Sequence, residues 1–423
     1  MNNWIQISIG EFIDFNPAET IKKGVVARKI SMDKLGTFQR KIVGSEYAVY
    51  SAGPKFRNDD TVVAKITPCL ENGKTALVDV LNEDEVAFGS SEFIVLREND
   101  YSDAKFIYYL ARSPIFRDRA ISCMEGTSGR KRVNEGALKR QEILVPKSKF
   151  DQKKIAAVLS ALDDKIELNN QINAELEALA KTLYDYWFVQ FDFPDESGKP
   201  YKSSGRKMVY HEVLKREIPE GWEVKNIFDV AKVQYGFPFS TQFFNADECG
   251  VPVIRIRDIL ENSISNYSSE NNVDEKYLIS KGDLLIGMDG NFHINYWSKN
   301  GCYLNQRVVM IKEKNIPNML VRYQIEPYIK LREKSVSRTT VGHLSDKDLK
   351  RLNILVPTKT VAEKSKKLFD RFLQKIVTNQ NQNQELAQLR DWLLPMLMNG
   401  QVTVGEVEEK GMVAEERTKY KSQ

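Results

Sequence analysis

The stretch LKRQEILVP occupies residues 138–146, and a close copy, LKRLNILVP, occupies residues 349–357. Each copy is followed by a long stretch without glycine or proline, Asp151 to about Val189 and Thr360 to Leu394. Because glycine and proline are the strongest helix breakers, both stretches are predicted to be long helices. The chain is therefore predicted to repeat one plan twice: a globular domain, a strand that ends in Val-Pro, and a long helix.

Both predicted helices carry a heptad seam, and adding 210 to a position in the first seam gives its counterpart in the second, asparagines included. An asparagine in an apolar seam costs stability unless it pairs, and such pairing fixes the register. Each helix could instead pack only on its own domain. The matched asparagines favour mutual packing as one antiparallel coiled coil, in which a helix of about forty residues is roughly 60 Å long. The predicted helix-pairing residues are Leu162, Ile166, Asn169, Asn173 and Leu176 in the first helix, and Phe372, Ile376, Asn379, Asn383 and Leu386 in the second.

The repeat also predicts the domain boundaries. Within each globular part, short apolar strands alternate with a few helices, so the fold class is α+β, with two similar mixed α/β domains related by a pseudo-two-fold internal repeat. The polar segment between the halves, FPDESGKPYKSSGRK, is typical of a connector. The charged C-terminal tail has too little apolar content to fold and is expected to be disordered. The predicted parts are a first domain at 1–147, a first long helix at 148–189, a connector at 190–220, a second domain at 221–358, a second long helix at 359–399, and the tail at 400–423.

The composition limits the class of protein. A chain of 423 residues with 42% hydrophobic and 28% charged residues is typical of a soluble protein with two to three domains. The apolar runs are too short to span a bilayer, and the N-terminus, MNNWIQISIGEF, lacks the basic and apolar regions of a secretory signal. We therefore expect a cytoplasmic protein that does not bind or span a membrane. The net charge of +4 allows nucleic-acid binding but does not by itself indicate it.

The residues offer little material for catalysis. The segment ITPCLENGKT at 66–75 ends like a phosphate-binding loop, but Pro68 stands where that loop needs a glycine, and proline has neither the N–H group nor the positive φ. The segment NPAE at 16–19 fails the amino-methyltransferase tetrapeptide at its last two positions. Pro194-Asp195 with Glu223-Val224-Lys225 matches a nuclease pattern that is common by chance. The sequence therefore favours a binding protein over a nucleotide hydrolase or a nuclease.

Metal binding is not indicated either. The four cysteines are widely separated single residues, which is typical of free thiols and excludes a Cys-x-x-Cys knuckle. The three histidines, His211, His293 and His343, are expected to be ordinary surface or loop residues.

Several longer segments resemble the specificity subunit of type I DNA restriction-modification systems. Together they extend along nearly the whole chain. In the first half they are DTVVAKITPCLENGKTALV at 60–78 and YDYWFVQFDFPDESGKPYKSSGRKMV at 184–209. In the second half they are IPEGWEVKNIFDVAKVQYG at 218–236, GVPVIRIRDI at 250–259, KGDLLIGMDG at 281–290 and LNQRVVMI at 304–311.

The resemblance implies a DNA-recognition function. Each globular domain would read one half of a bipartite, asymmetric target in double-stranded DNA, and the paired helices would set the unread spacer. Two modification subunits, which bind S-adenosylmethionine and methylate adenine, would dock on the helices, and restriction subunits would join them. S-adenosylmethionine, ATP and Mg²⁺ would belong to those partners, so this chain would hold no cofactor and would not be catalytic. A coiled-coil scaffold that binds only proteins is the alternative.

The sequence also offers candidate DNA-contacting residues, because readout of bases needs Arg, Lys, Asn, Gln or small hydroxyl side chains on loops that reach a groove. Each of them could contact a phosphate instead of a base. In the first domain they are Lys65, Thr67, Asn72, Lys74, Ser91, Arg130, Lys131 and Arg132. In the second domain they are Gln234, Tyr235, Arg255, Arg257, Asn291, His293, Asn305, Arg307 and Arg338.

Overall fold

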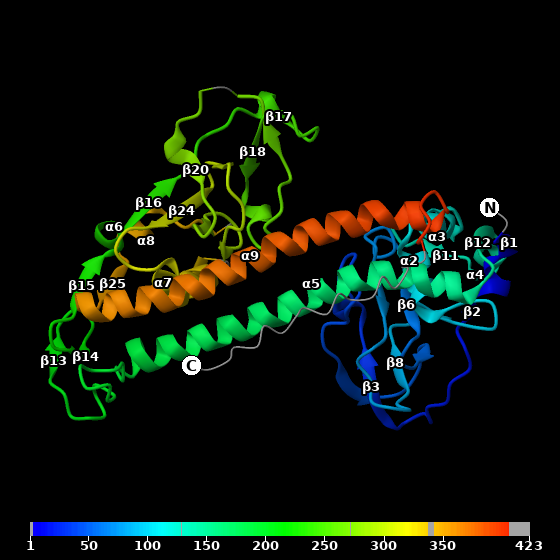
Figure 1. Cartoon of the computed structure of the whole chain (residues 1–423), viewed down its shortest axis with the longest axis horizontal. Coiled ribbons are helices and arrows are strands. Elements are labelled where there is room, and N and C mark those ends of the chain that lie inside the picture. Colours follow the sequence, from blue (N-terminus) through cyan, green and yellow to red (C-terminus); the bar gives the residue numbers. More distant parts are fainter. Residues whose placement is uncertain (1–2, 128, 271, 337–341, 406–423) are drawn as a thin grey trace, which may run out of the picture. The chain divides into compact units, whose positions relative to one another are not determined.

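A computed structural model describes residues 3–127, 129–270, 272–336 and 342–405 of the chain (Figure 1). The chain divides into two compact units. The first unit consists of Met1–Glu167 with Leu386–Gln423, and the second consists of Leu168–Glu385. Both boundaries fall within the long helices that the sequence predicted, so each unit contains a globular domain and a part of both helices.

The first unit is built on small, mostly antiparallel sheets. One sheet has the strand order β2-β9-β6-β7, a second has the order β4-β3-β8-β5 with β3 and β8 parallel, and β1 pairs with β12. Helix α2 begins after Asp103, whose side chain accepts a hydrogen bond from the Phe106 N–H group and caps the helix. The strands are β1 (Trp4–Ser8), β2 (Asp14–Phe15), β3 (Val26–Ile30), β4 (Glu46–Val49), β5 (Lys55–Phe56), β6 (Thr61–Ala64), β7 (Thr75–Leu77), β8 (Ala87–Gly89), β9 (Phe93–Arg97), β10 (Met124–Glu125), β11 (Arg132–Val133) and β12 (Glu142–Pro146); the short helices are α1 (Ile9–Phe12), α2 (Ala104–Arg112), α3 (Pro114–Ser122) and α4 (Glu135–Lys139).

The second unit repeats this plan. The order β16-β24-β21-β22 corresponds to β2-β9-β6-β7, β15 pairs with β25 as β1 pairs with β12, and a further sheet, β17-β19-β18-β23-β20, again contains one parallel pair, β18 with β23. The repeated strands β12 and β25 are the Val-Pro strands of the sequence repeat. The strands are β13 (Met208–His211), β14 (Arg216–Pro219), β15 (Glu223–Asn226), β16 (Ala231–Tyr235), β17 (Phe244–Asn245), β18 (Val251–Ile254), β19 (Tyr267–Ser268), β20 (Leu278–Ile279), β21 (Leu284–Gly287), β22 (Ile294–Tyr296), β23 (Cys302–Leu304), β24 (Val308–Glu313) and β25 (Asn353–Val356); the shorter helices are α6 (Ile227–Val230), α7 (Asn318–Val336) and α8 (Asp346–Leu349).

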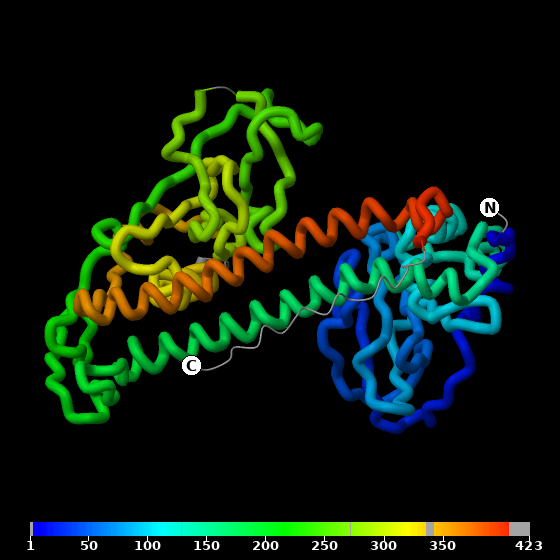
Figure 2. The backbone as a smooth tube through the Cα atoms, viewed as in Figure 1, coloured from blue at the N-terminus to red at the C-terminus, as the bar shows by residue number. Residues whose placement is uncertain are grey.

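Two long helices follow the Val-Pro strands. Helix α5 (Lys149–Tyr184) continues into a π-helical turn at Asp185–Val189, and α9 (Lys359–Met398) contains Pro395 in its last turn. In the first unit, Leu159 near the start of α5 and Leu397 near the end of α9 belong to one core. In the second unit, Ala180 near the end of α5 and Phe369 near the start of α9 belong to another. The helices are therefore antiparallel within each unit, as can be followed along the backbone (Figure 2).

The asparagines of the seam pair across the helices in the second unit. The Asn169 side-chain amide donates to the side-chain oxygen of Asn383, and the Asn379 amide donates to that of Asn173, both over 2.8 Å. Adding 210 converts one pair into the other, as an internal two-fold axis requires. Asn169 and Asn379 are each only 1% exposed. These hydrogen bonds satisfy polar groups that a shifted register would leave unpaired. Of the other predicted pairing residues, Ile376 is buried, whereas Leu162, Ile166, Leu176, Phe372 and Leu386 are half-buried.

The segment predicted as a polar connector contributes to the core of the second unit. Residues 190–220 include the antiparallel hairpin of β13 and β14. Phe191 and Phe193 are buried against Trp222, with ring centroids 5.5 and 5.2 Å apart. The buried aromatic residues alternate with polar ones, so the overall composition of the segment obscured them.

Candidate nucleic-acid interface

The loop at 66–75 uses the amides and the lysine of its Gly-Lys-Thr end for bonds within the protein. The N–H groups of Asn72, Gly73 and Lys74 donate to carbonyl groups earlier in the same turn. The Lys74 ammonium group donates to the Met32 carbonyl oxygen over 2.9 Å. A phosphate-binding loop needs these amides and this lysine to point at the ligand. The structure therefore gives a physical reason against the nucleotide-binding alternative.

In the first unit, three segments that carry predicted DNA-contacting residues lie together. They are the end of β6, the turn before β9, and the loop that leads into β11. The Thr67 N–H group donates to the Lys131 carbonyl over 3.0 Å, and the Lys65 N–H group donates to the Glu92 carbonyl over 2.9 Å. Strands and main-chain hydrogen bonds thus hold Lys65, Thr67, Ser91 and the basic residues 130–132 on one surface. We call this surface the first loop cluster.

Carboxylates pair with part of the first loop cluster. Arg132 forms a forked ion pair with Glu92, with a shortest distance of 2.7 Å, and this hydrogen bonding lowers the pKa of Glu92. Lys65 pairs with Glu135 over 3.2 Å. Arg130 and Lys131 are exposed, and their side chains have no ion pair among the described residues. They are the cations of this cluster most available to an anionic ligand.

In the second unit, five segments gather in the same way. The Gly236 N–H group donates to the Val308 carbonyl, and the Asn305 N–H group donates to the Ile254 carbonyl beside Arg255. The Met288 N–H group donates to the Arg307 carbonyl, and the Gly290 N–H group donates to the Gly342 carbonyl. We call the surface formed by residues 234–237, 254–257, 288–293, 305–307 and 342–344 the second loop cluster.

The basic side chains of the second loop cluster differ in whether they have an acidic partner. Arg307 and His343 both contact the Asp289 carboxylate, over 3.2 and 2.6 Å. Arg255 is half-buried beside the Phe244 ring and has no ion pair among the described residues. Burial lowers the pKa of Arg255, and the nearby Arg257 lowers it further. A half-buried arginine without a counter-ion is stabilised when an anion binds.

Some of the candidate residues make bonds inside their own domain. The Tyr235 hydroxyl group donates to Asp346 over 2.5 Å, and the Gln234 amide donates to the Tyr235 carbonyl. The Asn305 side-chain oxygen accepts from the Gln306 N–H group. Asn72, Arg257 and Asn291 are exposed, and His293 is half-buried. Arg338 lies outside the described residues.

Sequence reasoning missed the acidic residues that pair with these cations. Glu92, Glu135 and Asp289 contact basic residues 18 to 70 positions away along the chain, from Asp289 with Arg307 to Lys65 with Glu135. Nothing in local spacing predicts such pairs. His343, expected to be an ordinary loop histidine, is part of the second loop cluster, whereas His211 lies in strand β13.

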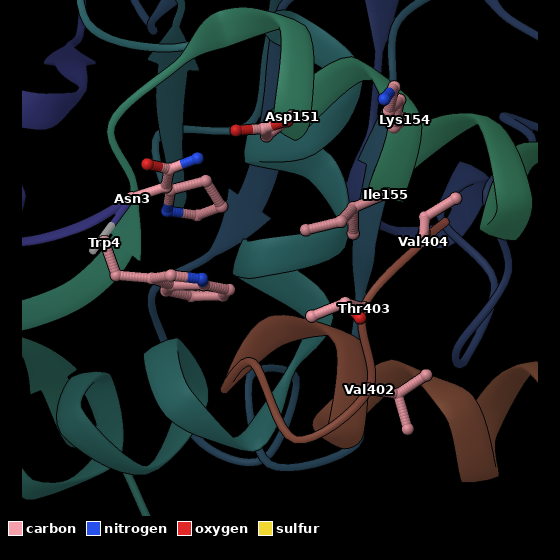
Figure 3. Close-up of a pocket in the computed structure, with 9 residues that line it drawn as sticks. Asn3, Trp4, Asp151, Lys154, Ile155, Val402, Thr403 and Val404 are labelled. Atoms are coloured by element: carbon pink, nitrogen blue, oxygen red, sulfur yellow. The ribbon is translucent and has the colours of Figure 1, made fainter. Parts of the chain in front are cut away.

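Two other features of the structure bear on chemistry. A pocket of about 390 Å³ lies beside Trp4 in the first unit, lined by the start of β1, the first turns of α5 and residues 402–404 (Figure 3). It contains none of the candidate DNA-contacting residues.

Within the described parts of the chain, no group of three or more His, Cys, Asp or Glu side chains could hold a metal ion. Asp195 of the nuclease-like pattern is paired with Arg206, and hydrogen bonds from the Ser197 hydroxyl and then from Arg206 lower the pKa of its carboxyl.

Comparisons with known proteins agree with this architecture. The sequence pattern of the type I restriction modification DNA specificity domain matches twice, at residues 1–178 and 219–388. The specificity subunit of the type I restriction enzyme MjaIX from Methanocaldococcus jannaschii is 27% identical over 318 residues, which cover 72% of this chain and 70% of that protein. The HindI specificity subunit from Haemophilus influenzae is 23% identical over 413 residues, which cover 82% of this chain and 87% of that protein.

A solved structure shares the fold. The crystal structure of the S subunit of a type I restriction-modification system from M. genitalium aligns with a TM-score of 0.53 and 18% identity, over 93% of this chain and 96% of that one. Two matches to the specificity domain, and relatives that are specificity subunits over most of their length, define the class of this protein as a DNA-specificity subunit. The chain belongs to the family of type I restriction-modification DNA specificity domains. Among the described residues, no helix is long and apolar enough to cross a membrane.

Proposed function

We propose that this chain reads a bipartite DNA target, with residues 1–147 reading one half-site and residues 221–358 reading the other. The observation that supports this most strongly is the repeat. Both units place a loop cluster rich in Arg, Lys, Asn or His next to the same pair of strands, β6 with β9 in one unit and β21 with β24 in the other. Because the loops differ in sequence between the units, the two half-sites differ as well.

The long helices set the number of base pairs between the half-sites. Helix α5 has 36 residues and α9 has 40. At ~1.5 Å per residue these helices are roughly 54 to 60 Å long, which corresponds to about 16 to 18 base pairs of B-DNA at 3.4 Å each. That span accommodates two short half-sites with an unread spacer between them.

Two modification subunits dock on the helices, and restriction subunits join the assembly. Leu179 in the second unit and Leu389 in the first are 54% and 43% exposed, and they are 210 residues apart, so equivalent apolar positions on the two helices face solvent. Trp392, one turn beyond Leu389, is 58% exposed. Large exposed apolar side chains at equivalent positions support two equivalent docking sites. S-adenosylmethionine, ATP and Mg²⁺ act in those partner subunits.

The proposed function is tested first by methylome sequencing of the host with and without this gene. One bipartite adenine-methylated motif should disappear with the gene. In vitro, the chain assembled with its modification subunits should bind a duplex that carries that motif, with an affinity that falls steeply as salt rises. Unchanged methylation and no salt-dependent DNA binding would support the alternative, a coiled-coil scaffold that binds only proteins. Turnover of ATP or cleavage of DNA by the purified chain would instead support an enzyme.

A further inference from the structure

In the second loop cluster, one carboxylate contacts both the candidate residue Arg307 and the histidine His343. One oxygen of Asp289 lies 2.6 Å from Nδ1 of His343, and the other lies 3.2 Å from Nε of Arg307. An ionised carboxylate only accepts hydrogen bonds, so Nδ1 of His343 carries the proton in this contact. The three residues come from three separate loops, and Asp289 joins those loops through side chains.

The loop that carries Asp289 is firmly anchored. Met288 and Phe292, on either side of the exposed turn, are 7% and 4% exposed. The Phe292 N–H group donates to Glu333 over 2.9 Å, and the Met288 N–H group donates to the Arg307 carbonyl over 3.0 Å. Gly290 has a φ of +69°, a conformation that glycine adopts without strain. The turn therefore holds Asp289 in place before any ligand arrives.

Asp289 approaches Arg307 at Nε, and not at the two terminal nitrogens that would contact a base. Asp289 contacts Nε, whereas Nη1 and Nη2 form no hydrogen bond with the residues that the structure describes, and the Arg307 side chain is 54% exposed. Arg132 in the first loop cluster differs, because Glu92 bonds both its Nε and its Nη2 and so occupies one of its terminal nitrogens. An arginine whose Nε faces a carboxylate can present its two terminal nitrogens as a planar, two-pronged donor.

We propose that Asp289 is a positioning residue, braced by His343, that orients Arg307 to read one guanine in the half-site of the second domain. This inference rests on the proposed function. In the major groove guanine presents two adjacent acceptors, O6 and N7, and the two terminal nitrogens of an arginine match them. Fixing the guanidinium beforehand removes the entropy cost of ordering a long side chain at the moment of binding. His343 keeps the carboxylate in the orientation that Arg307 requires.

Two other roles of the cluster lead to different results. If Asp289 only ties the loops together, its loss weakens binding to every sequence alike. If Arg307 contacts a phosphate, its loss also weakens all sequences, and it makes binding less sensitive to salt. Only a base contact made by an oriented Arg307 changes the preference at a single base pair.

The experiment uses the full chain assembled with its modification subunits. Binding is measured to the cognate duplex and to a set in which each base pair of the second half-site is replaced in turn. Arg307→Ala should reduce discrimination at one G·C pair by about five- to 150-fold, the ratio for a base contact of about 1–3 kcal/mol. Asp289→Ala should reduce discrimination at the same pair, and the double variant should lose little more than Arg307→Ala alone.

Two further variants keep the test independent of folding. Arg307→Lys keeps the charge beside Asp289 but lacks the planar fork, so it should also reduce discrimination at that pair while the overall affinity falls less. Glu92→Ala, the matched control in the first loop cluster, should leave the second half-site unaffected. A uniform loss of affinity for Asp289→Ala, an effect at a different base pair from Arg307→Ala, or a second half-site that shows no preference for guanine would each overturn the inference. Absence of any bipartite motif in the wild-type complex would instead refute the proposed function.

Discussion

A buried ion pair between the long helices of the first unit provides a quantitative prediction. Arg390 of α9 contacts Asp163 of α5, and the two side chains are only 6% and 3% exposed. The Tyr109 hydroxyl group donates to the other oxygen of Asp163 over 2.7 Å. At the equivalent positions of the second unit, 210 residues away, the chain has Ala180 and Leu373, both buried. The molecule thus contains an ionic and an apolar version of the same contact.

Removing only one partner of the ion pair should be costly. Arg390→Ala leaves the Asp163 carboxylate buried with Tyr109 as its remaining donor, and we expect a loss of about 3–5 kcal/mol in the free energy of unfolding. Asp391, the second partner of Arg390, keeps its ion pair with Arg112 over 2.8 Å, so it adds little to this cost. The variant Asp163→Leu/Arg390→Ala/Tyr109→Phe reproduces the apolar version and removes the unpaired hydroxyl as well. We expect it to lie within about 2 kcal/mol of the wild type, because apolar replacement of a buried ion pair is often neutral.

The assay is urea unfolding of the full chain, followed by far-UV circular dichroism. Hydrogen exchange of residues 151–167 should show that the loss in Arg390→Ala is located in the first unit. A loss of less than about 1 kcal/mol for Arg390→Ala, or a triple variant as unstable as Arg390→Ala, would contradict this role of the ion pair.

Three further predictions follow from other parts of the chain. Inserting four residues at Asn173 should lengthen the spacer of the methylated motif and leave both half-sites unchanged. An unchanged spacer in an active variant would contradict the proposal that the long helices set the spacer. The hydrogen bond from Arg28 lowers the pKa of Glu85, so the contribution of Glu85 to stability should be complete above about pH 4.5 and be lost as the pH falls through the lowered pKa. Glu85→Gln should remove this part of the acid dependence of unfolding. An acid dependence that is the same in Glu85→Gln and in the wild type would exclude this contribution. Lys74→Ala should leave the ATPase rate of the full restriction complex unchanged at saturating DNA, because Lys74 donates to a main-chain carbonyl, and a lost ATPase would restore the nucleotide-binding alternative.

The sequence predicted the features that depend on periodicity and repetition. The Val-Pro strands, the long helices and the asparagine pairs all follow from the copies at 138–146 and 349–357 and from the matched heptads. The partner of Arg390 could not be found in this way, because Asp163 lies beside the seam and not in it. The contribution of residues 190–220 to the core was missed because Phe191 and Phe193 are separated by polar residues.

The loop clusters were predictable only in part. Residues that flank the ends of strands, such as Lys65 and Arg307, could be predicted as candidate DNA contacts because the apolar pattern of the sequence predicts the strands. The pairing of cations with Glu92, Glu135 and Asp289 depends on which loops the fold brings together, and no local pattern contains that information. Composition also cannot distinguish a cation held by a carboxylate, such as Arg132, from an exposed one without an ion pair, such as Arg130.

If the two domains each read one half of the target, exchanging one domain should exchange one half-site. Residues 221–358 would be replaced by the corresponding domain of a related specificity subunit, and the methylated motif of the chimera would be determined by methylome sequencing. Assembly with the modification subunits would be verified first. We expect one half-site to change to that of the donor while the other half-site and the spacer remain. A chimera that assembles and yet alters both half-sites together would contradict this expectation, because the two domains would then have to read DNA as one composite surface.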